Sequence, residues 1–319
     1  MNRIASFLAA WLFAGLATAQ TYPDRAVRVV VPWPPGQATD LVARIVAQKL
    51  SESLGQPFVI ENKAGAGGQI GTDFVAKAAP DGYTLLAASA GPVTVSPLLQ
   101  KVAYDVDKNF AYVHLLGLSP YVLVTNPSFP ANNAREFIAL VRANPGKYSF
   151  SSSGTGAAAH LITEWLNSRA KLQATHVPYK GTSPAIIDVM NGQIAYTMET
   201  LVATSPHIKA GKLKAFGISI PRRSGVLPDV PTLIESADLP GFDVGAWLGL
   251  AFPAGTPPAI VARISNTTEK ILQVPDTRDK IISIGLEIDS RGADAFAVYL
   301  KEQQARFRDI IKTGNIKVD

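Results

Sequence analysis

A serine- and glycine-rich segment, Ser151–Gly156, precedes a helical pattern that carries His160. Hydroxyl groups and free backbone amides at a helix N-terminus can solvate an anion without any cationic side chain. The segment therefore indicates an anion-binding loop. A helix capped by Ser153 or Thr155, with no ligand, explains the same residues equally well.

Three further loops follow predicted strands and are rich in Gly, Pro and small polar residues. In open α/β sheets, ligands bind beyond the carboxyl ends of the strands, where loops lead into helices. Prolines stiffen the first of these loops, and Gly36 lets its backbone amides face a ligand. The three loops are Pro32–Asp40, Ala88–Gly91 and Pro178–Thr182.

Other chemistries are poorly supported. The glycine run Gly65–Gly71 lacks the G-x-G-x-x-G spacing of a dinucleotide loop. His160 and Glu164 lie four residues apart on a predicted helix, but the other histidines fall in unrelated elements, so we expect no metal and no cofactor. No Gly-x-Ser-x-Gly elbow surrounds Ser151–Ser153, so a secreted hydrolase is only a distant alternative and we expect no enzyme.

Strands that alternate with helices predict parallel sheets covered on both faces. The alternation runs to about residue 90 and resumes at Tyr121; an apolar run, Gly245–Phe252, and three C-terminal helices follow. The expected strands are Val27–Val31, Phe58–Glu61, Thr84–Ala88, Tyr121–Thr125, Tyr148–Ser151, Thr175–Val177, Ile194–Met198 and Leu213–Ser219. The first expected helix begins near Thr39 and ends at Gly55. The other expected helices are Gln69–Ala78, Ala134–Ala143, Ala157–Ser168, Pro184–Met190, Ala203–Ala210, Pro258–Leu272, Thr277–Ile284 and Ala293–Ile311.

The N-terminus has the pattern of a secretory signal. Arg3 precedes an apolar stretch that ends in Ala17-Thr18-Ala19, so we expect cleavage before Gln20 and a soluble periplasmic protein. The stretch is shorter than the roughly 20 residues that span a bilayer. The chain has no Cys, and its formal net charge of +5 is dispersed, which argues against nucleic-acid binding.

Many ordered sequence blocks resemble one family over essentially the whole mature chain. The chain is similar to the Bug receptors of tripartite tricarboxylate transporters. The blocks are Tyr22-Pro23, Pro32–Asp40, Glu61-Asn62, Gly65–Gly71, Ala79–Leu85, His160-Leu161, Val177–Gly181, Pro206–Leu213 and Leu227–Thr232.

This resemblance implies an α/β protein with the type II periplasmic-binding-protein fold, in which two lobes close on a small organic carboxylate. It implies a membrane permease of one large and one small subunit as partner, and we expect the receptor to be a monomer. The expected lobes are residues 20–120 with 226–319, and residues 121–225, after a signal peptide over residues 1–19. A receptor for a membrane signalling protein is an alternative function, since it would use the same closure.

The resemblance also implies which residues bind the ligand, with Asp40 orienting the first loop. The first lobe supplies Trp33, Pro34, Gln37, Ala38, Asp40, Ser89 and Ala90, and the second supplies Ser152, Ser153, Thr155, Gly156, His160, Lys180, Gly181 and Glu199.

Three positions depart from the family pattern. Gln37 replaces the second Gly of a usual pair, Ala157 replaces a hydroxyl residue, and Glu199-Thr200 stands where an Asp-Asn pair is frequent. An acidic residue near the pocket can pair with a ligand ammonium or be structural, so an amino-acid ligand stays open.

Overall fold

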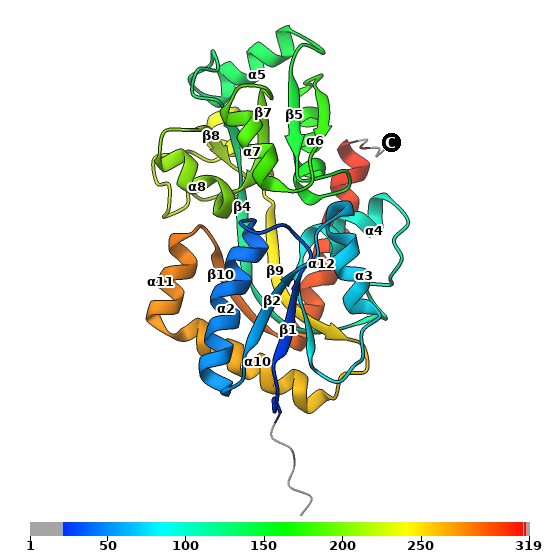
Figure 1. Cartoon of the computed structure of the whole chain (residues 1–319). Coiled ribbons are helices and arrows are strands. Elements are labelled where there is room, and N and C mark those ends of the chain that lie inside the picture. The colour runs from blue at the N-terminus through cyan, green and yellow to red at the C-terminus, as the bar shows by residue number, and fades with distance from the viewer. Residues whose placement is uncertain (1–21, 315, 317–319) are drawn as a thin grey trace, which may run out of the picture.

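The structure is a computed structural model that describes residues 22–314 and residue 316. The predicted signal sequence lies outside the described residues. Figure 1 shows two α/β lobes, one above the other, joined by the long strand β4 (Phe110–Thr125) and by β9 (Gly245–Pro253). The first part of β4 pairs with β9, and its last five residues pair with strands of the upper lobe.

The lower lobe is built on the valine-rich strand β1 (Val27–Val31), which lies between β2 (Phe58–Asn62) and β3 (Thr84–Ser89). Both pairings are parallel, and all of β1 except Arg28 is buried, as expected for a strand covered on both faces. Val29 packs with α2 (Ala38–Leu54), and Val30 packs on the opposite face with α3 (Gln69–Ala76). The sequence predicted these elements correctly, including the end of α2 at Gly55, whose φ is 72°.

Strands β4, β9 and β10 (Glu287–Gly292) of the lower lobe are antiparallel to their neighbours and so depart from the predicted parallel sheet. Strand β9 is antiparallel to β3 and β4, and β10 is antiparallel to β4. The sequence predicted only the end of β4, because Gly117 and Pro120 interrupt its apolar pattern. Gly117 lies at a register shift, and a Cβ there would be 2.3 Å from the Glu287 carbonyl oxygen. Strand β10 was missed because all six of its residues are half-buried and mostly polar.

The upper lobe contains three parallel strands next to the end of β4. Strand β5 (Ser149–Ser152) pairs with both β6 (Thr175–Pro178) and β7 (Tyr196–Thr200), while β7 and β8 (Lys214–Ile218) pair antiparallel with β4. The alternation of strands and helices predicted from Tyr121 onward is confirmed. The helices of this region are α5 (Ala134–Ala143), α6 (Ala158–Ala170), α7 (Thr182–Met190), α8 (Leu201–Lys209) and the unpredicted α9 (Leu233–Ala237).

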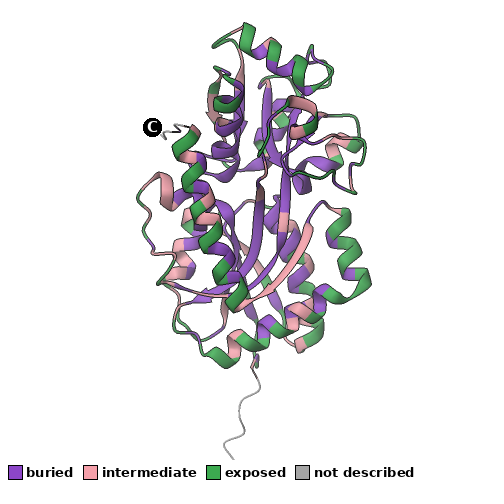
Figure 2. Ribbon diagram, turned by 180° about the vertical axis from the view of Figure 1, so that it is seen from behind, coloured by how far each residue is buried: buried purple, intermediate pink, exposed green. Residues whose placement is uncertain are grey.

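Two of the three C-terminal helices pack on β4. Helix α10 (Pro258–Gln273) contacts β4 and α2, α11 (Pro275–Ser283) contacts α2, and α12 (Ala293–Gly314) contacts β4 and also α6. Two short helical turns, η2 (Gly91–Val95) and α4 (Ser96–Leu99), follow β3 and were not predicted. Figure 2 shows that the central strands are buried, that a strand of the lower lobe has intermediate burial, and that the outer faces of the helices are exposed. Within the described part of the chain, no helix has the length and apolar character needed to cross a membrane.

Ser219 links the chain segments that cross between the lobes. Its fully buried Oγ accepts the Tyr121 N–H at 2.8 Å and donates to the Val244 carbonyl at 2.5 Å. Its backbone also bonds to the same two residues. The side chain therefore satisfies one donor and one acceptor of the backbone at the point where β4 and the segment before β9 meet.

We expect Ser219→Ala to lower the free energy of unfolding by about 2 kcal/mol, because each buried backbone group left unpaired costs about 1–3 kcal/mol. Urea unfolding followed by circular dichroism measures the change. The exposed Ser283→Ala serves as the control and should stay within about 0.5 kcal/mol of the parent. Equal stability of the two variants would show that Ser219 does not brace the crossover.

Candidate ligand-binding site

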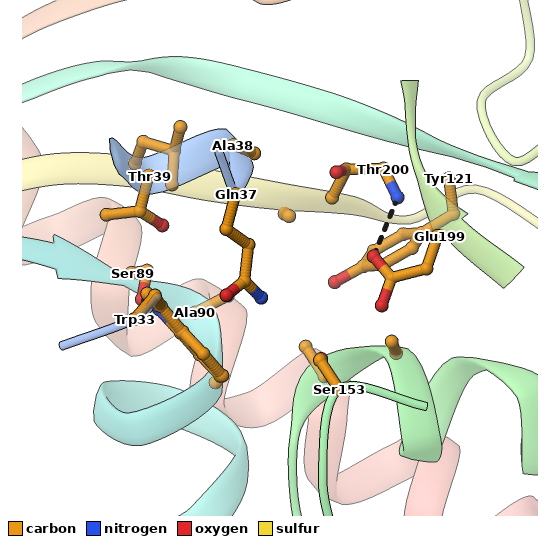
Figure 3. Close-up of a pocket in the computed structure, with 15 residues that line it drawn as sticks. Trp33, Gln37, Ala38, Thr39, Ser89, Ala90, Tyr121, Ser153, Glu199 and Thr200 are labelled. Atoms are coloured by element: carbon orange, nitrogen blue, oxygen red, sulfur yellow. Dashed lines mark hydrogen bonds between the residues drawn. The ribbon is translucent and has the colours of Figure 1, made fainter. Parts of the chain in front are cut away.

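A small cavity lies between the lobes, and we call it the inner cavity (Figure 3). Its volume is about 40 Å³, enough for a few water molecules. Both lobes and the connecting strands contribute to its wall. Its lining residues are Trp33, Gln37, Ala38, Thr39, Ser89, Ala90, Gly91, Tyr121, Ser153, Ala158, Ala159, Glu199, Thr200, Ala246 and Leu248.

Two helix N-termini, one from each lobe, begin at the inner cavity. Helix α2 starts at Ala38, and α6 starts at Ala158. The first backbone N–H groups of a helix have no partner within the helix. Neither N-cap residue, Gln37 in α2 or Ala157 in α6, caps its helix with a side-chain hydrogen bond. The cavity is therefore lined by unused amide donors at the positive ends of two helix dipoles.

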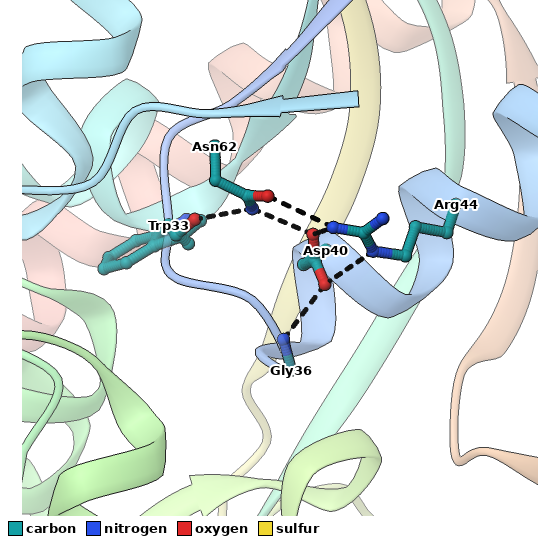
Figure 4. A network of polar contacts seen from close by, with 5 residues as sticks. All are labelled: Trp33, Gly36, Asp40, Arg44 and Asn62. Atoms are coloured by element: carbon teal, nitrogen blue, oxygen red, sulfur yellow. Dashed lines mark hydrogen bonds and ion pairs between the residues drawn. The ribbon is translucent and has the colours of Figure 1, made fainter. Parts of the chain in front are cut away.

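The first loop is held in place by Asp40 (Figure 4). Its carboxylate accepts hydrogen bonds from the Gly36 N–H at 2.9 Å, from Asn62 at 2.8 Å and from two nitrogens of Arg44. Asn62 also donates to the Trp33 carbonyl at 2.9 Å. Burial opposes ionisation of Asp40, but the hydrogen bonds from Arg44, Asn62 and Gly36 outweigh it and lower the pKa of the carboxyl. Asp40 thus orients the loop from behind and does not line the cavity.

Trp33 forms one wall of the cavity. The indole N–H donates to Ser89 Oγ at 2.9 Å, and only 5% of Trp33 is exposed. A Cβ at Gly91 would lie 3.1 Å from the indole, so the chain after β3 approaches the ring closely because residue 91 is Gly. Trp33 and Ser89, predicted from separate loops, are therefore brought together.

The third loop rests on two stacked histidines. The rings of His160 and His176 lie 3.8 Å apart, centroid to centroid, and His160 Nδ1 accepts the Gly156 N–H at 3.3 Å. His176 Nε2 forms a 2.6 Å hydrogen bond with Ser152 Oγ. Burial lowers the pKa of both imidazoles to about 4, so both are neutral at pH 7. His160 and Ser152 therefore support the loop and do not line the cavity.

This arrangement corrects one expectation from the sequence. The Gly156 amide was expected to face an anion, but His160 already accepts its hydrogen bond. The helix begins at Ala158, so the unused amides belong to the residues that follow the glycine-rich loop. The Gly156 carbonyl instead accepts a hydrogen bond at 3.1 Å from Ser96 Oγ, on α4 of the lower lobe. This bond connects the two lobes.

Glu199 brings a buried carboxyl group to the cavity from the end of β7. Only 2% of the residue is exposed. Its Oε2 accepts the Thr200 N–H at 3.2 Å, and the side chains of Thr182 and Ser153 lie close enough to the carboxyl group to lower its pKa through hydrogen bonds. Burial raises the pKa of Glu199 to about 7, although hydrogen bonds, that from Thr200 above all, oppose the rise.

An outer groove of about 440 Å³ adjoins the inner cavity and shares Trp33 and Ser153 with it. It lies where the loops of the two lobes approach each other. A Cβ at Gly181 would be 2.6 Å from Pro34, and one at Gly67 would be 3.1 Å from the Thr155 carbonyl oxygen. The groove is lined by Trp33, Pro34, Gly65, Ala66, Gly67, Gly68, Gln69, Gln100, Ser153, Gly154, Thr155, Pro178, Tyr179, Lys180 and Gly181.

The residues expected at the site thus fall into three groups. Trp33, Gln37, Ala38, Ser89, Ala90, Ser153 and Glu199 line the inner cavity. The outer groove is lined by two of these, Trp33 and Ser153, and also by Pro34, Thr155, Lys180 and Gly181. The remaining four, Asp40, Ser152, Gly156 and His160, line neither space.

Sequence reasoning missed several residues of the inner cavity. Ala158 and Ala159 carry no polar side chain, and only the position of the helix start could have identified them. Tyr121, Ala246 and Leu248 lie on the connecting strands, so the topology was needed to place them.

The geometry does not support a metal site at His160 and Glu164. His160 Nε2 lies 3.9 Å from the Glu164 carboxylate. Across residues 22–314 and 316, no group of three His, Cys, Asp or Glu side chains is arranged to hold a metal ion.

Comparison with known proteins identifies the family. Residues 42–316 match the tripartite tricarboxylate transporter family receptor, TctC. The chain is 39% identical to Protein BugT of Bordetella pertussis over 272 residues, which cover 85% of this chain and 83% of BugT.

Two solved structures are similar throughout. Rpa4515 of R. palustris, determined with adipate, has a TM-score of 0.90 and 31% identity, covering 93% of this chain and 99% of that one. MatC of Rhodopseudomonas palustris, with bound malate, has a TM-score of 0.85 and 36% identity, covering 91% of this chain and all of the other. The predicted two-lobe periplasmic-binding-protein fold is confirmed, and the chain belongs to the tripartite tricarboxylate transporter receptor family.

Proposed function

We propose that this protein captures a small organic carboxylate in the inner cavity and delivers it to a tripartite tricarboxylate transporter. The observation that carries the proposal is the meeting of two uncapped helix N-termini, those of α2 and α6, at one buried cavity. The adipate and malate found in the two similar structures support a carboxylate as the ligand. The proposed role consists of binding and release, with no chemical step.

Neutral donors are sufficient for this role. None of the cavity-lining residues in the described part of the chain is Lys, Arg or His. A hydrogen bond to a charged group contributes about 1.5–3 kcal/mol, and micromolar affinity requires about 8 kcal/mol. Three or four amides and hydroxyls around the carboxylate, assisted by the helix dipoles, therefore account for binding in this range.

Closure of the lobes completes the proposed site. Residues of both lobes and of the connecting strands line the cavity, so we propose that the lobes separate to admit the ligand. The Ser96–Gly156 hydrogen bond across the cleft supports a closed form stabilised by contacts between the lobes. We propose that ligand binding shifts an existing open–closed equilibrium toward this form.

The lobe boundaries that we propose lie at the two crossovers. The first crossover is near residue 120, where the pairing of β4 changes from β9 to β7. Helix α9 contacts α5 and β8, which supports placing the second crossover after α9, nearer residue 245 than residue 226. The expected division at residues 225 and 226 is refined accordingly.

The family supports the remaining parts of the proposal. We propose that the receptor acts as a monomer in the periplasm after cleavage before Gln20. Its partner would be a membrane permease of one large and one small subunit, as receptors of this family are expected to serve.

Removing a single amide tests the binding mode. Ala158 is the first residue of α6, a position that accepts proline, and Ala157 already has the extended backbone that proline requires before it. We expect Ala158→Pro to weaken binding of the carboxylate at least tenfold, because it deletes one N–H donor to a charge. Isothermal titration calorimetry measures the affinity for the acid that most raises Tm in a screen of mono-, di- and tricarboxylates.

Ala158→Gly keeps the N–H and is the matched control, with affinity expected near that of the parent. Ala38→Pro removes the corresponding donor of α2 in the other lobe and should weaken binding similarly. Parental affinity in both folded proline variants would contradict binding by the helix N-termini.

The Glu199 carboxyl group makes stability depend on pH. The folded protein keeps a proton on Glu199 up to about pH 7, whereas the unfolded chain releases it near pH 4.5. The stability of the ligand-free protein therefore falls as the pH rises from about 4.5 to about 7. We expect Glu199→Gln to be more stable than the parent at pH 8, by roughly 1–3 kcal/mol, with the difference vanishing below pH 4.5.

Denaturant unfolding of both proteins at pH 4, 6 and 8 measures this dependence. Glu302→Gln, on an exposed position of α12, controls for the loss of a charge and should show no such gain. A Glu199→Gln variant that is less stable than the parent at pH 8 would mean that the carboxylate form is well solvated or paired in the folded protein.

A further inference from the structure

A histidine, two serines and a carboxylate form a chain of hydrogen bonds in the lower lobe, outside the inner cavity. His114 of β4 is fully buried, and its Nδ1 lies 3.0 Å from Ser265 Oγ on α10. Its Nε2 lies 2.8 Å from Ser290 Oγ on β10 and 3.3 Å from Glu269 Oε2 on α10. The Ser290 hydroxyl donates to the same carboxylate oxygen at 2.5 Å. Three elements distant in the sequence thus bring these side chains together.

The carboxylate at one end of the chain sets the direction of every hydrogen bond in it. The hydrogen bond from Ser290 lowers the pKa of Glu269, and an ionised carboxylate only accepts. Ser290 therefore gives its proton to Glu269 and accepts from His114 Nε2–H. The other ring nitrogen, Nδ1, then carries a lone pair, and the Ser265 hydroxyl donates to it.

The His114 ring is in the form that can take this proton. Burial lowers the pKa of His114, although the neighbouring Glu269 opposes the change, so the ring is neutral at pH 7. A hydroxyl that donates to a neutral imidazole, which a third group orients, is the arrangement of an activated serine nucleophile.

Ser265 also lines a groove between α10 and the start of α12. The groove has a volume of about 680 Å³, and much of its wall consists of small apolar side chains such as Ala111, Val261 and Ala262. Only 7% of Ser265 is exposed. The hydroxyl can therefore be reached from the groove, while the imidazole behind it is shielded from water.

The first turn of α12 borders the same groove. Residues 292–295 line it, and a Cβ at Gly292 would lie 3.5 Å from Ser265 Oγ. The first backbone N–H groups of a helix have no partner within the helix and lie at the positive end of its dipole. Amides of this kind stabilise the negative oxygen that forms during acyl transfer. A nucleophile, its base and donors for an oxyanion thus meet at one place.

We propose that Ser265 is a nucleophile that accepts acyl groups from small neutral esters, with His114 as its general base. As Ser265 Oγ bonds to the ester carbonyl carbon, its proton passes to His114 Nδ1. The bond from that carbon to the alcohol oxygen then breaks, and the departing oxygen takes the proton from His114. Water attacks the acyl-serine by the same route, which releases the acid and restores Ser265.

The charge of the groove favours a neutral substrate. No Lys, Arg or His among the described residues lines it, and the carboxylate of Asp294 would repel an anionic ester. The activity is separate from the proposed function, because neither Ser265 nor His114 lines the inner cavity.

Reaction with p-nitrophenyl acetate tests the proposal on the mature chain, residues 20–319. We expect release of nitrophenolate together with acetylation of Ser265, which mass spectrometry of proteolytic peptides locates. Diisopropyl fluorophosphate, which reacts with activated serines, should label the same residue and block the release. If both reagents leave Ser265 unmodified in the folded protein, the proposal is wrong.

Variants of α10 and β4 separate the nucleophile from its base. Ser265→Ala should lower the rate of nitrophenolate release at least tenfold. Thr267→Ala is the matched control and should keep the parental rate, because the Thr267 hydroxyl lies on the same helix but donates to the Arg263 carbonyl. His114→Asn keeps a hydrogen-bonding group but no base, and should slow the labelling of Ser265 about 100-fold.

Circular dichroism establishes that each variant is folded. Should His114→Asn fail to fold, the labelling of Ser265 in the parent still decides the question. A parental rate of nitrophenolate release in folded Ser265→Ala would overturn the assignment of the nucleophile.

Discussion

The structure depends on backbone amides that two helices leave unpaired. Helices α2 and α6 start at the same cavity from opposite lobes, and neither N-cap side chain satisfies the first N–H groups. A buried donor without an acceptor costs free energy, so the closed form is incomplete without a group that accepts from both helices. An anion satisfies this requirement without a cationic side chain, which explains how an inner cavity with no Lys or Arg among its described lining residues can bind a carboxylate.

Much of the surrounding structure fixes these two helix ends. Asp40 joins the start of α2 to Asn62 and Arg44, and the stacked rings of His160 and His176 support the loop before α6. The crossing strands place the lobes opposite each other. Because these braces each lie within one lobe, the opening that we propose breaks the Ser96–Gly156 hydrogen bond but leaves both braces in place. This division of contacts suits a receptor that must close on its ligand and later release it.

The sequence predicted most of the fold, because the periodicity of valine-rich strands and amphipathic helices is a local property. It missed β10, whose residues are half-buried and polar, and the first part of β4, where Gly117 and Pro120 interrupt the pattern. At the site, residues with distinctive side chains such as Trp33, Gln37 and Glu199 could be named in advance through resemblance. Ala158 and Ala159 could not, because their contribution is a backbone group whose position depends on where the helix begins.

The most direct test of the central claim observes these amides themselves. In ¹H–¹⁵N NMR spectra of the ligand-free protein, addition of the bound acid should move the amide resonances of Ala38 and Ala158 downfield together, since both form hydrogen bonds to one carboxylate. The amidated form of the same acid should not produce these shifts. If the acid binds while either resonance stays in place, the carboxylate does not bridge the two helices, and the account of the site is wrong.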